Sequence, residues 1–262
     1  MLTRQELKNV TFGAELEYST DSNIGKWLNG YNTLPPYQST GEIDLNCNFT
    51  SDNSIESNTQ GMTQGLEIRV DYGSYHQLLR RVKRIFNLLN KKELKNHYEV
   101  NKSTGLHIHI GAKGTPASSL KSIYDGWRNW GERYFLDISP LSRENNTYCK
   151  SVAGINFRNW VAGVQDNGDR LEQDRHYLSI NPQFVYDSNS TIEIRVFQST
   201  KVFTKFKAYL KLVYLFLQAE GDRLHFDQLL SENPSLLKWV ETRKKKFDLL
   251  RDKLQGAGEG DN

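Results

Sequence analysis

Long apolar runs, a secretory leader and a disulfide framework are all missing from this sequence of 262 residues. No stretch reaches the roughly 18 consecutive apolar residues of a membrane span. The N-terminal stretch MLTRQELKNV lacks the apolar core of a signal peptide. The two cysteines, Cys47 and Cys149, are too few and too far apart for a disulfide framework or a zinc knuckle. We therefore expect no membrane association and a reducing, cytoplasmic location.

A strong charge bias is also missing, since the formal net charge is only +3. This weak bias neither demands nor excludes nucleic acid, and we interpret the basic face of a helix at 75–92 as a solvated surface. We therefore do not expect nucleic acid as a partner. No GxxxxGK[ST] phosphate loop occurs, so a nucleotide would have to be held by metal ions and arginines.

The composition, with 37% hydrophobic residues, indicates a globular chain. We expect a single domain over 1–254, with a long flap or insertion at about 19–64 that contains short strands near 46–57, and a disordered tail at 255–262. Periodicity predicts strands at 9–18, 65–72, 97–100, 105–112, 177–186 and 190–199, and helices at 75–92, 116–137, 201–220, 224–231 and 235–254. This order favours an α+β fold with a mainly antiparallel sheet.

Four of these strands share one pattern, in which apolar residues alternate with chemically active ones. One face of each strand is apolar, and the other carries Glu15 and Glu17, Glu67 and Arg69, His107 and His109, or Glu193 and Arg195. For any single strand, a solvated face explains the alternation. If these strands are neighbours in the sheet, the carboxylates and imidazoles converge on one surface, which is suited to divalent metal ions. The carboxylate majority favours magnesium or manganese over zinc, and the arginines indicate an anionic ligand such as a polyphosphate.

The ordered set Glu-x-Glu, Glu, Gly-Leu-His-x-His, Glu-x-Arg resembles the amidoligase branch of the glutamine synthetase and glutamate–cysteine ligase superfamily. Three further segments match that branch: SDNSI (51–55), the loop SPLSRENNTYC with Arg143, Tyr148 and Cys149, and the strand HYLSIN with Tyr177 and Asn181. The resemblance runs from about residue 10 to about residue 220. The motifs are short, and their common order along the chain carries the resemblance.

The resemblance implies a curved antiparallel sheet with a metal-binding concave face and helices packed on the other face, as in the glutamine synthetase catalytic domain. It implies that Glu15, His107 and Glu193 hold one metal ion, and that Glu17 and Glu67 hold another near the carboxylate substrate. Arg195 would stabilise the transferred phosphoryl group, and His109 would lie near the phosphates. Arg143 joins the implied catalytic residues, and Asn181 with Arg175 the implied nucleotide contacts, although His176 could take the place of Arg175.

The implied activity is that of an ATP-dependent carboxylate–amine ligase, which forms an amide through an acyl phosphate with Mg²⁺ or Mn²⁺. The expected partners are ATP, a carboxylate and an amine, the amine being an amino acid, a polyamine or a peptide. Two alternatives stay open from the residues alone. One is a metal-dependent hydrolase that uses the same Glu/His cluster, and the other is a non-catalytic binding module derived from the fold. The sequence does not identify the substrates, the base for the amine or the oligomeric state.

Overall fold

The computed structural model describes residues 10–21, 24, 46–56, 61–144, 146–162, 177–182 and 191–258, with side chains described as far as 254. Among these residues, the strands form one sheet: β1 (Phe12–Thr20), β2 (Cys47–Ser51), β3 (Gln64–Gly73), β4 (Tyr98–Glu99), β5 (Gly105–Gly111), β6 (Ile180–Asn181) and β7 (Thr191–Gln198). The helices are α3 (Tyr75–Leu89), α4 (Ala117–Gly126), α5 (Glu132–Asp137), α6 (Phe157–Ala162), α7 (Phe203–Gln218), α8 (Arg223–Ser231) and α9 (Pro234–Gly258).

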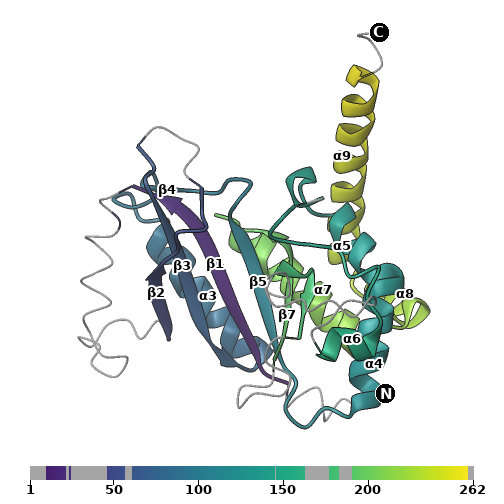
Figure 1. Cartoon of the computed structure of the whole chain (residues 1–262). Coiled ribbons are helices and arrows are strands. Elements are labelled where there is room, and N and C mark those ends of the chain that lie inside the picture. The colour runs from purple at the N-terminus through teal and green to yellow at the C-terminus, as the bar shows by residue number, and fades with distance from the viewer. Residues whose placement is uncertain are drawn as a thin grey trace.

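The sheet is curved and its strands lie in the order β2-β3-β1-β5-β7-β6, with β4 paired to the far end of β1 (Figure 1). Every pairing between these strands is antiparallel. The predicted α+β class with a mainly antiparallel sheet is therefore confirmed. Because β1 and β5 lie at the centre, the residues of these two strands are flanked by neighbours on both sides.

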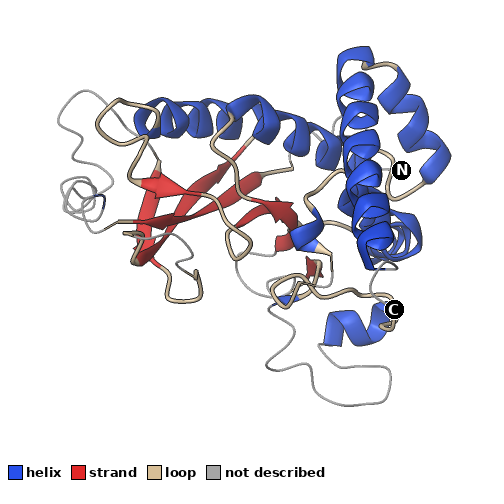
Figure 2. Ribbon diagram, turned by 90° about the horizontal axis from the view of Figure 1, so that it is seen from above, coloured by secondary structure: helices blue, strands red, loops and turns tan. Residues whose placement is uncertain are grey.

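One face of the sheet is the floor of the hydrophobic core. Leu16, Ile68, Ile108 and Ile194 come from four different strands, and each is fully buried. Helices α3 and α7 cover this face. Figure 2 shows the helices on one side of the sheet. The opposite face is thereby left for the residues that alternate with these apolar side chains.

Helix α3 begins as its sequence predicts. Ser74 is the N-cap: its hydroxyl oxygen accepts from the Gln77 backbone N–H at 3.3 Å, and the Gln77 side chain accepts from the Ser74 N–H at 2.8 Å. Leu78, Val82 and Phe86 lie on the buried stripe of this helix. The capping box and the apolar stripe fix both the start of the helix and the face that packs on the sheet.

The predicted helix at 116–137 differs in its middle. A π-helical turn at Trp127–Gly131 separates α4 from α5. Trp127 lies in the core and stacks on Phe135, with ring centroids 5.2 Å apart. Trp127 and Phe135 are therefore core residues.

The flap predicted at 19–64 contributes to the sheet at both of its ends. Residues 19–20 belong to β1 and Gln64 begins β3, while Cys47–Ser51 forms the edge strand β2 that was expected near 46–57. Most of the segment between Asp21 and Asn46 lies outside the described residues. At the other end of the chain, α9 continues to Gly258 rather than ending at residue 254. Among the described residues, no helix is both long and apolar enough to cross a membrane.

Candidate functional site

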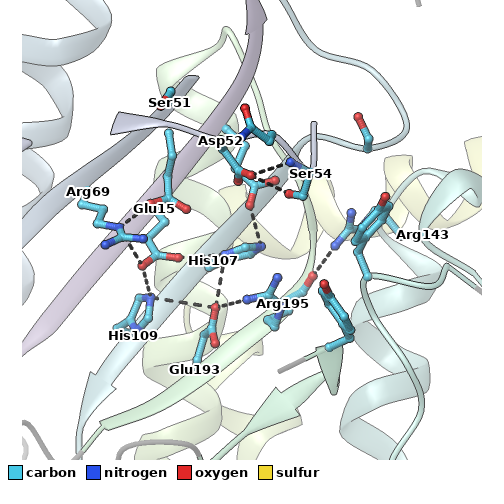
Figure 3. A pocket seen from close by; sticks show the side chains of 16 residues that line it. Glu15, Ser51, Asp52, Ser54, Arg69, His107, His109, Arg143, Glu193 and Arg195 are labelled. Atoms are coloured by element: carbon cyan, nitrogen blue, oxygen red, sulfur yellow. Dashed lines mark hydrogen bonds and ion pairs between the residues drawn. The ribbon is translucent and has the colours of Figure 1, made fainter. Parts of the chain in front are cut away.

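The register of the central strands brings polar residues together on the face opposite the core. Glu15 on β1 lies between Arg69 on β3 and His107 on β5. His109 on β5 is paired with Glu193 on β7. The register shifts between Leu106 and Ile108, where β7 contains one extra residue, so that Arg195 and Val196 both lie opposite His107. Segments that are distant in sequence thus meet at one site, which Figure 3 shows from close by.

Glu15, His107 and Glu193 form what we call the histidine cluster. Each of the three residues offers one potential ligand atom, and these three atoms all lie within 4.8 Å of one another. The Nδ1 atom of His107 lies 3.0 Å from Glu15 Oε2 and 3.1 Å from Glu193 Oε1. The three residues predicted to share one metal ion are therefore adjacent.

Other side chains hold the histidine cluster in place. Asn181 on β6 donates to Glu193 Oε2 at 3.0 Å, and Arg195 forms a hydrogen-bonded ion pair with Glu193 Oε1. The Nε2 atom of His109 lies 3.3 Å from Glu15 Oε1. Both glutamates of the cluster are thus partnered by fixed donors, which orients their carboxylates before any ligand arrives.

These contacts determine the charge of the two glutamates. Burial opposes ionisation of Glu15, but hydrogen bonds from His107 and His109 more than offset it and hold the pKa of Glu15 well below its usual range. Burial likewise opposes ionisation of Glu193, and the charges of Arg195 and the two histidines lower the pKa of Glu193 overall. Both residues are therefore carboxylates at neutral pH.

Glu17, Asp52 and Glu67 form a second group, which we call the acidic cluster. Glu17 is paired with Glu67 across β1 and β3, and oxygen atoms of all three carboxylates lie within 4.8 Å of one another. The Gly105 backbone N–H donates to Glu17, while Asp52 Oδ1 accepts from the N–H and the hydroxyl of Ser54 at 2.8 and 2.7 Å. Burial and the negative charge of Glu15 raise the pKa of Glu67. Three carboxylates at this spacing repel one another unless a cation lies among them.

The two clusters are connected through His107. Its Nδ1 atom faces the histidine cluster, while its Nε2 atom lies 3.4 Å from Glu17 Oε1 in the acidic cluster. A single imidazole therefore holds both clusters in one rigid arrangement.

Arg143 is a buried cation beside the clusters. Its side chain is in the core of the protein at 1% exposure, and its Nη2 atom donates to the Arg195 carbonyl at 2.6 Å. The Nε and Nη1 atoms of Arg143 and the Nε atom of Arg195 find no hydrogen-bond partner among the described residues. Burial lowers the pKa of Arg143, and a buried guanidinium with unsatisfied donors is costly. These donors indicate that an anionic ligand completes the site.

Cys149 lies next to Arg143 and is buried. Burial raises the pKa of the Cys149 thiol to about 11. The thiol is therefore protonated at neutral pH, which argues against Cys149 as a nucleophile.

Both clusters and the arginines open onto one cavity of about 390 Å³. Its lining contains both clusters, His109, three arginines (Arg69, Arg143 and Arg195) and a set of neutral polar residues: Ser51, Asn53, Ser54, Ser103, Tyr148 and Tyr177. The cavity wall is thus mainly polar and charged, as a site for phosphates and metal ions requires.

The structure brings together most of the residues that the sequence singled out. Glu15, Glu17, Glu67, His107, His109, Arg143, Glu193 and Arg195 all line the cavity. Asn181 supports Glu193 from β6 and does not itself line the cavity among the described residues. Arg175, predicted as a nucleotide contact, and its alternative His176 lie outside the described residues.

Two charged residues that line the cavity were not among the individually predicted site residues. Asp52 belongs to the SDNSI segment that the resemblance singled out, but a ligand role for it depends on the turn after β2. Arg69 was counted among the arginines that indicate an anionic ligand, but no individual role was predicted for it. Ser103 on the 100–105 turn carries no sequence signal at all, and its hydroxyl accepts from the Glu56 backbone N–H at 2.9 Å.

Two solved structures show a distant similarity to this chain. Plasmodium falciparum glutamine synthetase is 14% identical with a TM-score of 0.43, covering 81% of this chain and 51% of that one. The complex between the prokaryotic ubiquitin-like protein Pup and its ligase PafA is 14% identical with a TM-score of 0.39, covering 82% of this chain and 48% of that one. This chain thus spans about half the length of each. No protein-family profile matches the chain, and neither does any curated protein sequence.

Proposed function

We propose that this protein is an ATP-dependent carboxylate–amine ligase that uses Mg²⁺ or Mn²⁺ and forms an amide or peptide-like bond through an acyl phosphate. One observation carries the proposal. Two adjacent groups of metal-type ligands and two buried arginines converge on the same cavity. Phosphoryl transfer to a carboxylate needs this combination, because negative charge develops on several oxygens at once.

The donor atoms suit hard divalent ions. The acidic cluster offers carboxylate oxygens only, which are ligands that Mg²⁺ and Mn²⁺ prefer. Its three neighbouring negative charges would be stabilised by a cation among them. Glu17, Asp52 and Glu67 would hold one ion. Glu15, His107 and Glu193 would hold the other, with Asn181 orienting Glu193 from behind.

The arginines suit an anionic substrate. Arg195 is fixed by Glu193, and Arg143 is fixed by the carbonyl of Arg195, so both guanidinium groups are oriented in advance. The unsatisfied Nε and Nη1 donors of Arg143 and the unsatisfied Nε donor of Arg195 suit phosphoryl or carboxylate oxygens. Divalent ions, when bound, would neutralise charge on the same oxygens and polarise the leaving group.

Each side chain then has a definite task. Arg195 binds the transferred phosphoryl group, and Arg143 binds an anionic oxygen deeper in the cavity. His107 keeps Glu15, Glu17 and Glu193 in register, and His109 stabilises Glu15 as a carboxylate. The polar wall formed by Ser54, Ser103, Tyr148 and Tyr177 is where the amine and the carboxylate would be recognised.

The test is to measure ADP release with Mg²⁺ while amino acids, polyamines and peptides are offered as amines together with candidate carboxylates. We expect ADP release that depends on both organic substrates and is lost in Glu15→Ala and Glu193→Ala. Glu93→Ala, at an exposed glutamate outside the site, is the control.

Full activity of Glu15→Ala and Glu193→Ala would contradict the proposal. Phosphate or ester cleavage without any need for an amine would instead indicate a metal-dependent hydrolase that uses the same clusters.

A further inference from the structure

Arg69 lies between the two clusters. It is paired with Glu15 across β1 and β3, and it shares a strand face with Glu67 two residues before it. Its Nε atom contacts Glu67 Oε1 directly and lies 3.8 Å from Glu15 Oε1. Figure 3 shows Arg69 beside Glu15. The negative charge of Asp52 also acts on Arg69. The Arg69 guanidinium therefore interacts with carboxylates of both clusters.

Arg69 differs from the other two arginines of the cavity in its exposure. The Arg69 side chain is 59% exposed, whereas that of Arg195 is 7% exposed. Arg143 and Arg195 are held by buried partners, as described above. Only the Arg69 end of its pair with Glu67 is exposed, so the guanidinium can turn into solvent when another cation takes its place at Glu67.

The oxygen that Arg69 contacts belongs to one of the three carboxylates of the acidic cluster. Glu67 Oε1 also accepts a hydrogen bond from the Thr50 hydroxyl at 3.4 Å. A carboxylate oxygen has two lone pairs, and those of Glu67 Oε1 already face Arg69 and Thr50. A divalent ion that binds this oxygen must displace one of the two donors, and its positive charge repels Arg69. The two cations therefore compete for Glu67.

We propose that Arg69 is a resident counter-cation of the acidic cluster, which divalent metal displaces from Glu67. This inference rests on the proposed metal site but not on the ligase reaction. Without metal, Arg69 neutralises Glu67 and limits the repulsion among the clustered carboxylates. When metal binds, the guanidinium turns out toward the cavity mouth, which makes metal binding and the release of Arg69 a single exchange.

The exchange is tested by titrating Mn²⁺ into the protein without nucleotide and measuring the dissociation constant by calorimetry. We expect Arg69→Gln to bind Mn²⁺ several-fold more tightly than the wild type, because the competitor is gone. Arg69→Lys, which keeps the charge on a flexible stem, should bind with an affinity between the two. The control is Arg80→Gln, which removes the same charge from the exposed side of α3 and should leave the affinity unchanged.

A double-mutant comparison separates competition from a general effect of charge. In a Glu67→Gln background the contested carboxylate is gone, so adding Arg69→Gln should no longer tighten Mn²⁺ binding. Unchanged or weaker Mn²⁺ binding by Arg69→Gln would overturn the proposal, and so would a gain that persists in the Glu67→Gln background. Because no step uses ATP, an inactive ligase that still shows the exchange would contradict only the proposed function.

Discussion

The two clusters of the cavity are built on opposite plans. In the histidine cluster, Glu15 and Glu193 are partnered by histidines, an arginine and an amide, and both have lowered pKa values. In the acidic cluster, the carboxylates are held by a backbone N–H, hydroxyl groups and one exposed arginine, and the pKa of Glu67 is raised. The carboxylate charges of the histidine cluster are balanced by neighbouring side chains, whereas those of the acidic cluster need a further cation. This difference indicates that metal binding changes the acidic cluster more than the histidine cluster.

The largest effect should come from breaking the histidine cluster at its centre. Glu193→Ala would leave Arg195 buried without its partner, and removing one member of a buried ion pair costs about 3–5 kcal/mol. We expect this loss in the free energy of unfolding, measured with urea, and a loss of ADP release. Glu193→Gln, which keeps a side chain of the same shape, should recover part of the stability. A cost below about 1 kcal/mol for Glu193→Ala would mean that the pair is not structural.

The connection between the clusters can be broken at Gly105. A Cβ atom there would lie 2.5 Å from His107 Nε2 and 3.0 Å from Glu17 Oε2. Gly105→Ala should therefore displace His107 from both clusters and weaken metal affinity about 10- to 100-fold, as changes to groups that orient ligands do. Gly154→Ala, where the added Cβ meets nothing within 4 Å, is the matched control. Equal Mn²⁺ affinities of the two variants would contradict the connection through His107.

The dependence of the acidic cluster on a cation can be sharpened at Asp52. Mg²⁺ at about 100 times its dissociation constant should stabilise the wild type by about 2.7 kcal/mol, or roughly 5–10 °C in Tm. Asp52→Asn removes one of the three neighbouring charges. We expect its metal-free form to be at least as stable as the wild type, and its gain with Mg²⁺ to be much smaller. Thermal unfolding with and without Mg²⁺ measures both quantities, with Asp71→Asn, at an exposed position on β3, as the control. A full Mg²⁺ response in Asp52→Asn would exclude Asp52 as a ligand.

The smallest effect is a pH dependence of opposite sign in the two clusters. The pKa values of Glu15 and Glu193 are lowered by folding, so their stabilisation is present above the ordinary glutamate pKa and is lost as pH falls below it. The pKa of Glu67 is raised, so its contribution is fully present below the ordinary value and is lost as pH rises through the raised pKa. In the metal-free wild type, the free energy of unfolding measured with urea should therefore fall as pH rises just above the ordinary glutamate pKa. Glu67→Gln should not show this fall. An identical pH profile for the wild type and Glu67→Gln would contradict the raised pKa.

The sequence predicts the histidine cluster better than the acidic one, for a physical reason. Glu15, His107 and Glu193 lie on three adjacent central strands, where alternation and antiparallel register determine which side chains meet. Asp52 lies in the turn after an edge strand, and its backbone carbonyl lies close to Gly65. A Cβ atom added to Gly65 would lie 1.9 Å from the Asp52 carbonyl oxygen. No periodicity encodes such an approach, so the third acidic ligand could not be predicted.

Arg69 and the π-helical turn show the same limit. The strand pattern predicts the face on which Arg69 lies, but its pairing with Glu15 depends on the register between β1 and β3. The turn at Trp127–Gly131 interrupts an otherwise continuous helical pattern, and it places Trp127 so that its indole N–H donates to the Ser179 hydroxyl at 3.1 Å. Tertiary contacts of this kind are not visible in local sequence.

Anomalous diffraction from crystals grown with Mn²⁺ and ADP tests the account most directly, because it locates metal ions without assuming any reaction. The account predicts two manganese peaks in the cavity, one coordinated by Glu15, His107 and Glu193 and one by Glu17, Asp52 and Glu67, with the Arg69 guanidinium turned away from Glu67. A cavity that binds ADP without manganese at either cluster, or manganese bound only elsewhere on the protein, would contradict it.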